Sequence, residues 1–195
     1  MKPNSIAVVG AAETTKMGVI PELSYMGLHL DAALNAMADA GRKPTDIDGV
    51  ATAGISPTEL AWYLGITPRY ADGTSVGGCS FMLHVRHAAA AINEGLCETV
   101  LITHGESGRS RVGRTQPARG PSSYGGQFEA PFGTAGPPTA FTIPALRYMK
   151  RFGLREEDLA IVAVIQREWA SRNPRAITSL PTIASPGAMR RSNSG

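Results

Sequence analysis

The stretch GGCSFMLHVRHAAAAINEGLCETVLITHGES, residues 77–107, places a glycine turn, a helix and a strand in direct succession. Residues 81–93 contain no glycine or proline and include four consecutive alanines, which favours a helix. Gly95 ends that helix, and the β-branched apolar run at 99–103 is typical of a buried strand. This stretch therefore predicts a helix followed by a strand of an α/β fold.

The same alternation extends toward the N-terminus. Residues 6–10, IAVVG, predict a buried strand, and apolar positions from 23 to 37 recur at helical spacing up to the stop at Gly41. A second strand is predicted at 47–53 and a short helix at 60–64. Alternating strands and helices predict an α/β fold in which helices are layered on a mostly parallel sheet.

The composition changes after this α/β region. Glycine, proline, serine and arginine dominate residues 105–144, where we expect a long loop, and stretches of that length are often functional. Helices are predicted at 145–152 and 155–171, and disorder at 182–195, where large apolar residues are few. We therefore expect an α/β core at 1–107, an inserted loop region with helices at 108–176, and a divergent, disordered tail at 177–195.

The composition excludes several classes of protein. The chain has 195 residues, 43% hydrophobic and 18% charged, and a net charge of +3, which is too small for a nucleic-acid-binding surface. No apolar stretch reaches the roughly 20 residues of a membrane span, and no signal-cleavage pattern follows the first apolar run. Cys79 and Cys97 would lie about 27 Å apart along a helix, too far for a disulfide. We expect a soluble protein of the reducing cytoplasm.

Cys79 is the candidate nucleophile. A cysteine at the start of a helix lies near unpaired N–H groups and the positive end of the helix dipole, and both favour the reactive thiolate. The flanking Gly77 and Gly78 would let a substrate carbonyl approach the backbone. The alternative is a small buried cysteine that only packs, since free cysteine is among the most buried residue types.

Three histidines are also candidates for chemistry. His104 directly follows the strand at 99–103, and ligands of open α/β sheets bind at the carboxyl ends of strands. The alternative is an ordinary loop residue. His84 and His87 share one helix face, but no third ligand follows at the next turn, so we predict no metal site and assign both to packing and hydrogen bonds.

Four arginines lie close together with no acidic residue among them: Arg109, Arg111, Arg114 and Arg119. Guanidinium groups form paired hydrogen bonds to phosphate oxygens, so this cluster could bind a phosphorylated ligand. The alternative is a solvated loop. The sequence has neither a phosphate-binding P-loop pattern nor a dinucleotide glycine fingerprint, so ATP and NAD are not indicated.

Several motifs, taken in order, resemble the thiolases, and most of all the thiolase-like, lipid-transfer-protein branch near sterol carrier protein X. They are IAVVG at 6–10, IDGV at 47–50, GGCSF at 77–81, AAAAINEG at 88–95, TVLITHGES at 99–107, QFEAPFG at 127–133 and NPRA at 173–176. The resemblance covers nearly the whole chain to Ala176. It implies the N-terminal half of a thiolase fold, with an inserted loop region that helps to hold coenzyme A.

The resemblance also implies a function. Its members form or cleave carbon–carbon bonds in CoA thioesters, by acyl transfer or by retro-aldol cleavage, usually as dimers and in some cases with a small OB-fold partner. It implies Cys79 as acyl carrier, a histidine and a second cysteine from a C-terminal half, and a CoA thioester as substrate with no tightly bound cofactor. The expected substrate-binding and CoA-binding residues are Gly78, Ser80, Arg109, Arg111, Arg114 and Arg119.

The chain departs from the pattern of the thiolases in three ways. Their C-terminal half has no counterpart here, so we expect a truncated protein that is inactive alone. Counting back from Gly95 places their nucleophile at Gly78 rather than Cys79, and the usual continuation is lost after Ala176. The alternative function is a non-catalytic CoA-binding, lipid-binding or assembly subunit that completes a larger complex. A small α/β hydrolase is disfavoured because no Gly-x-Ser-x-Gly elbow is present.

Overall fold

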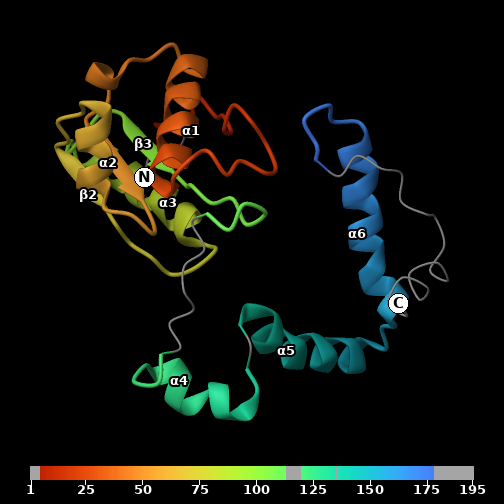
Figure 1. Cartoon of the computed structure of the whole chain (residues 1–195). Helices are drawn as coiled ribbons and strands as arrows, with labels where there is room; N and C mark the ends of the chain where they lie inside the picture. The colour runs from red at the N-terminus through yellow and green to blue at the C-terminus, as the bar shows by residue number, and fades with distance from the viewer. Residues whose placement is uncertain (1–4, 113–119, 135, 178–195) are drawn as a thin grey trace. The chain divides into compact units, whose positions relative to one another are not determined.

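The computed structural model describes residues 5–112, 120–134 and 136–177. The chain divides into two compact units, Met1–Thr115 and Gln116–Gly195 (Figure 1). The first unit contains a sheet covered by helices, and the second contains helices only, within the residues described.

The sheet of the first unit has three parallel strands in the order β2-β1-β3. They are β1 (Gly49–Thr52), β2 (Tyr70–Asp72) and β3 (Val100–Thr103). The prediction of an α/β fold with a parallel sheet is confirmed. β2 was not predicted, because its three residues, YAD, are too few to show a strand period.

Three helices flank the sheet. They are α1 (Tyr25–Asp39), α2 (Pro57–Leu64) and α3 (Ser80–Asn93), and a 3-10 turn, η1 (Pro44–Asp46), follows α1. Ser24 and Ser56 cap α1 and α2 by accepting a backbone N–H bond, and Pro57 occupies the first turn of α2, where its missing N–H costs nothing. The helices predicted in this unit are therefore present.

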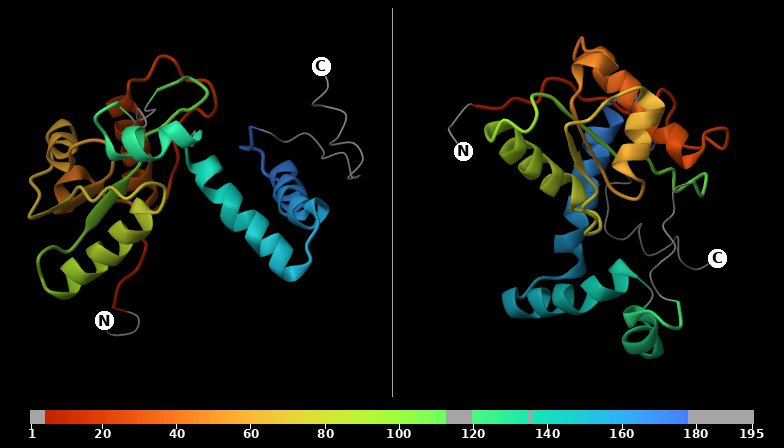
Figure 2. Two further views of the ribbon diagram at one scale, coloured as in Figure 1. Left: turned by 90° about the horizontal axis from the view of Figure 1, so that it is seen from below. Right: turned by 90° about the vertical axis from the view of Figure 1, so that its left-hand side faces the viewer.

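The hydrophobic core lies where α1 and α2 meet the sheet. It is formed by Ala33, Met37, Ile47, Val50, Leu60, Ala61, Leu64, Ile66 and Leu101. The helices α1 and α2 pack on each other and on the sheet, and α3 contacts all three strands from the other face (Figure 2). All four residues of β1 are buried, as expected for a central strand covered on both faces.

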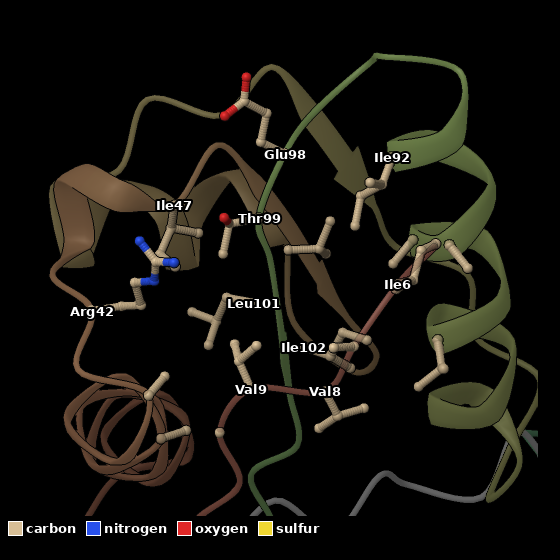
Figure 3. Close-up of a pocket in the computed structure, with 18 of the residues that line it drawn as sticks. Ile6, Val8, Val9, Arg42, Ile47, Ile92, Glu98, Thr99, Leu101 and Ile102 are labelled. Carbon is tan, nitrogen blue, oxygen red and sulfur yellow. The ribbon is translucent and has the colours of Figure 1, made fainter. Parts of the chain in front are cut away.

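The predicted first strand is wrong. Residues 6–10 are extended but belong to no strand, and Val8 and Val9 are 81% and 59% exposed. Hydrogen bonds hold both ends of this segment: the Ser5 hydroxyl donates to Asn93 of α3, and the Ala11 N–H donates to Asp39 of α1. The run has strand-forming residues, but none of the described strands pairs with it, so its backbone lies outside the sheet, along a cavity of about 470 Å³ (Figure 3).

The second unit contains α4 (Tyr124–Phe128), η2 (Ala130–Phe132), α5 (Pro137–Phe152) and α6 (Glu156–Ser171). The predicted long loop at 105–144 is therefore partly helical, and α5 begins well before the predicted start at 145. Proline misled that prediction: Pro137 lies in the first turn, where proline is tolerated, and Pro144 lies inside an exposed helix, where water can reach the carbonyl that it leaves unpaired.

α6 confirms the predicted helix at 155–171. The Arg155 N–H donates to the Asp158 carboxylate at 2.7 Å, which closes a capping box. Several of its large apolar residues are about half exposed or more, among them Ile161, Ile165 and Trp169. The predicted disordered tail at 182–195 lies outside the described residues. Within the part of the chain that is described, no helix has the length and apolar character needed to cross a bilayer.

Candidate functional site

The three parallel strands all finish at the same end of the sheet, its carboxyl end, so the loops that follow them converge there. The last residues of these strands are Thr52, Asp72 and Thr103. Residues 73–79 lead from β2 into α3, and residues 104–112 follow β3. The carboxyl end of the strands is the usual position of a ligand site in an α/β fold, and it contains most of the site residues predicted from the sequence.

The turn before α3 places Cys79 at the helix N-cap, exposed to solvent. Its Sγ lies 3.8 Å from the Val76 carbonyl oxygen. Ser80 behind it is fully buried: its hydroxyl donates to Gly77 O at 2.6 Å and accepts from the Val76 N–H at 3.0 Å. The Ser80 hydroxyl therefore closes the turn, whereas Cys79 is exposed to solvent.

Gly78 is open as well. A Cβ built on Gly78 meets no atom within 4 Å, so this position could accommodate a side chain. Within the described residues, no acceptor is recorded for the backbone N–H of Gly78 or of Cys79. Two adjacent N–H groups at a helix start are suited to receive an oxygen that gains negative charge.

His104 lies beside this turn. Its ring centroid is 4.5 Å from that of Phe81 in the first turn of α3, and its Nε2 lies 3.5 Å from the Glu106 carboxylate. Both members of this pair are about half exposed. The structure thus brings the predicted His104 to the same end of α3 as Cys79 and adds Glu106, which the sequence did not single out.

His29, which the sequence analysis missed, is buried next to the carboxyl ends of β1 and β3. Its Nδ1 lies 2.8 Å from the Thr103 hydroxyl and 3.4 Å from that of Thr52, while Nε2 has no hydrogen-bond partner in the described structure. Burial and, secondarily, the charge of His104 lower the pKa of His29 to about 4. A Cβ at Gly105 would overlap the His29 ring, so glycine is required there. The imidazole is therefore neutral at pH 7.

His84 and His87 fasten the end of β2 to α3. The Nε2 of His84 lies 2.9 Å from the Thr74 carbonyl oxygen, and the Nδ1 of His87 lies 2.8 Å from the Asp72 carboxylate. Burial raises the pKa of Asp72, but hydrogen bonds from Thr74 and His87 outweigh it and bring that pKa to about 2. The described residues contain no cluster of three metal-binding side chains.

Two of the four predicted arginines lie on a short hairpin after β3. Arg109 and Arg111 are exposed, between Ser107 and Val112, whose backbones pair as an antiparallel bridge. The Ser107 hydroxyl donates to Gly18 O at 3.1 Å, which anchors the hairpin to the N-terminal segment. Arg114 and Arg119 lie outside the described residues.

The second cysteine is far less accessible. Cys97 is buried between α3 and β3. Burial, together with the nearby Asp48 carboxylate, raises the pKa of its thiol. Both cysteines are free, and only Cys79 is exposed.

The chain is similar in sequence and structure to several known proteins. No family model matches the chain. It is 34% identical over 182 residues to a steroid side-chain-cleaving aldolase of Thermomonospora curvata, matching 88% of this chain and 46% of that protein. It is 32% identical over 182 residues to a 17-hydroxy-3-oxo-4-pregnene-20-carboxyl-CoA lyase of Mycobacterium tuberculosis, with the same coverage.

An acetyl-CoA acetyltransferase of Methanothermobacter thermautotrophicus is 29% identical over 181 residues, or 88% of this chain and 46% of that protein. Among solved structures, an Ltp2-ChsH2(DUF35) aldolase matches with a TM-score of 0.70 and 29% identity, over 88% of this chain and 46% of that one. The chain thus spans about half the length of the curated relatives that it matches.

Proposed function

Because the chain belongs to the thiolase superfamily, in its thiolase-like, lipid-transfer-protein branch, we propose that it is part of an enzyme that cleaves a carbon–carbon bond of a β-hydroxyacyl-CoA thioester by a retro-aldol reaction. The observation that carries the proposal is the match of 88% of this chain to an aldolase structure with a TM-score of 0.70. Two curated relatives named as an aldolase and a CoA lyase support the same reaction class.

The proposed reaction needs no oxidant and no nucleophile. A base removes the proton of the β-hydroxyl, the bond between the α and β carbons breaks, and the β carbon leaves as a carbonyl compound. The electron pair moves to the α carbon and is delocalised onto the thioester oxygen as an enolate, which then takes a proton at the α carbon. The protein must supply a base, hydrogen-bond donors for the enolate oxygen and contacts for CoA.

The described residues offer donors for the enolate oxygen. We assign this role to the N–H groups of Gly78 and Cys79, because they immediately precede α3 and have no recorded acceptor in the described structure. Since no covalent acyl intermediate forms in a retro-aldol step, a glycine at position 78 is compatible with it. Cys79 would then line the site without attacking the substrate.

His104 is our candidate for proton transfer on this chain, because its imidazole is exposed beside the turn and paired with Glu106. Arg109 and Arg111 would bind the phosphates of CoA, together with Arg114 and Arg119 outside the described residues. CoA enters as the carrier of the substrate, and we propose no tightly bound cofactor.

We further propose that this chain does not complete the site alone. The thiolases that it resembles take a histidine and a second cysteine from their other half, and the chain spans 46% of its relatives' length. The aldolase structure is named for two components, Ltp2 and ChsH2(DUF35), which supports a partner-bound subunit. We therefore propose that the site is completed by other chains. These are a small OB-fold partner, a separately supplied second half and a second copy in a dimer.

The test compares the chain alone with the chain co-expressed with the portion of the Thermomonospora aldolase that lies outside the match. Each sample is incubated with 17-hydroxy-3-oxo-4-pregnene-20-carboxyl-CoA, and mass spectrometry follows the released ketone. We expect turnover only from the combined sample, retained after Cys79→Ser. Steady turnover by the chain alone would contradict its incompleteness. Thiolysis of a 3-oxoacyl-CoA that disappears in Cys79→Ser would replace the retro-aldol proposal by acyl transfer.

A second candidate is a non-catalytic CoA-binding or assembly subunit. It is favoured by the glycine at the position where the nucleophile of the thiolases is expected and by the commitment of the Ser80 hydroxyl to its own turn. Calorimetry separates the two candidates. A subunit of this kind would bind CoA and the complementary portion, yet the combined sample would not release the ketone.

A further inference from the structure

The loop after β3 that carries His104 rests directly on a buried imidazole. His29 of α1 is 0% exposed. A Cβ built on Gly105 would overlap the Cδ2 atom of His29 and come within 2.8 Å of its Nε2. Gly105 does not have the positive φ that usually requires glycine, so this contact, and not the backbone conformation, excludes a side chain at position 105. The His29 ring therefore supports the loop between His104 and Glu106.

The orientation of the His29 ring is fixed from its opposite edge. Its Nδ1 lies 2.8 Å from the Thr103 hydroxyl at the end of β3 and 3.4 Å from the Thr52 hydroxyl at the end of β1. The Thr52 hydroxyl donates to the Thr103 carbonyl oxygen at 3.2 Å, so its own position is fixed by the sheet. One edge of the ring is thus held by two strands, while the edge formed by Nε2 and Cδ2 lies against the loop.

His104 packs on two other rings. The centroids of the His29 and His104 rings are 6.4 Å apart with their planes at 77°, an edge-to-face arrangement. The Phe81 ring, in the first turn of α3, lies 4.5 Å from that of His104. The side chain of His104 is nevertheless 46% exposed. Contacts with His29 on one side and Phe81 on another therefore define where a half-exposed imidazole lies.

Packing alone does not account for a histidine at position 29. No hydrogen-bond partner is recorded for its Nε2 within the described residues, and an unpaired buried nitrogen destabilises a fold. A leucine would avoid that cost, but it could not form the bond to Thr103 that orients the ring. Burial and, secondarily, the charge of His104 bring the pKa of His29 to about 4, so the ring is neutral at pH 7. Burial and the Glu106 charge raise the pKa of the neighbouring Tyr25, which is neutral too, so the Glu106 carboxylate is left to His104.

We propose that His29 is a positioning residue, which holds the His104 imidazole beside the first turn of α3 by supporting Gly105 and by packing on the His104 ring. His29 is fully buried, so it acts through His104 and not on a substrate. The inference rests on the proposed function for its consequence, which is that proton transfer by His104 depends on His29. The position of His104 itself is measured without turnover.

The first experiment measures the position of His104 by NMR on the full chain at pH 7. Nuclear Overhauser effects between the ring protons of His104 and Phe81 report their contact, and slow exchange of the β1 amides reports that the chain is folded. We expect the ring contact in the unmodified chain and its loss in His29→Ala. Leu64→Ala is the control, because it removes a buried side chain from the hydrophobic core and should leave the ring contact intact. An unchanged contact in His29→Ala, or an equal loss in Leu64→Ala, would overturn the proposal.

The second experiment tests the same contact from the side of the loop. Gly105→Ala places a methyl group against the His29 ring and should displace the loop, whereas in the double variant with His29→Ala the methyl group has room. Gly105→Ala should therefore lower the urea midpoint of unfolding in the unmodified chain but not in His29→Ala. An equal decrease in both backgrounds would show that the two residues do not act on each other, and would overturn the proposal.

The third experiment separates the position of His104 from the proposed reaction. The chain, unmodified or with His29→Ala, is combined with the complementary portion of the Thermomonospora aldolase and given the CoA thioester named above. We expect His29→Ala to lower kcat at least about tenfold and to change KM by less than about threefold, because the CoA contacts remain. An unchanged kcat would overturn the role of His29 in the reaction. If no sample releases the ketone, the retro-aldol proposal fails, and the NMR contact still decides whether His29 positions His104.

Discussion

The two units of the chain have equally regular helices and very different interiors. In Met1–Thr115, α3 has 14 residues, and Leu28, Val50 and Leu60 are at most 1% exposed. In Gln116–Gly195, α5 and α6 have 16 residues each, yet no apolar side chain among the described residues is buried. Capping and helix propensity therefore shape both units, but only the first has the apolar packing that stabilises a fold.

The same contrast exists within the sheet. Among the described residues, β1 is paired on both edges and wholly buried, β3 is paired with β1 alone, and the run at 6–10 is paired with no strand. The sequences of these segments are alike in their β-branched residues. A strand therefore depends on its neighbours for pairing.

The largest expected effect is the difference between two leucines. Leu60→Ala removes a fully buried side chain from the core and should lower the free energy of unfolding by about 2–5 kcal/mol. Leu146→Ala alters a side chain of α5 that is 58% exposed, and it should change the free energy of unfolding by less than about 0.5 kcal/mol. Urea denaturation measures both. Equal losses would mean that the second unit has a core of its own.

A smaller effect is expected from pH, through the buried His29. Its pKa of about 4 lies below the ordinary value, so the unfolded chain takes up a proton that the folded ring excludes. Stability should therefore fall as the pH drops from about 6.5 to about 4, by roughly 3 kcal/mol in total, and level off below that. Asp72, with a pKa of about 2, adds a loss only below about pH 4.

The His29→Gln variant is the control for this pH dependence, since glutamine keeps a polar group near Thr103 but does not titrate. Denaturation at a series of pH values should show a flatter profile between pH 6.5 and 4 in the variant. The same slope in both proteins would assign the pH dependence to another group.

The two cysteines flank α3 and should differ in their reactivity toward an alkylating reagent. Cys79 is exposed at the N-cap, whereas Cys97 is 1% exposed and has a raised thiol pKa. A limiting alkylating reagent at neutral pH should label Cys79 at least about tenfold faster, because a buried thiol reacts only after the structure opens. Mass spectrometry gives both rates. Faster labelling of Cys97 would contradict its burial in the loop between α3 and β3.

The smallest effect concerns the hairpin arginines. Replacing Arg109 and Arg111 by glutamine should weaken CoA binding a few-fold at low salt and have little effect at high salt, because exposed charges are screened over about 8 Å at physiological ionic strength. Arg147→Gln on α5 is the control. Calorimetry that finds tight, salt-independent binding in the double variant would remove these residues from the proposed CoA site.

The elements predicted correctly are those whose signal is local. The alanine run of α3, the glycine that follows it and the apolar run of β3 are sufficient to define them. β2 is too short to show a period, and the run at 6–10 has the β-branched composition of a strand but no partner strand among the described residues. α5 contains a proline that normally indicates a break.

The candidate site divides in the same way. Cys79 and His104 follow from their positions at a helix start and a strand end, which sequence can indicate. The burial of Ser80 and the contact of His29 with Thr103 depend on tertiary packing. The signal that could have found His29 is its position on the apolar face of α1, between Met26 and Ala33.

Residue-resolved hydrogen exchange on the full chain tests the account most directly. It predicts slow exchange at the amides of Val50 and Ala51 in β1. It predicts fast exchange at Val100 and Ile102, whose N–H groups face away from β1, and throughout α5 and α6. Slow exchange at these two amides in the chain alone would show that the edge of β3 is already closed, and would contradict the account.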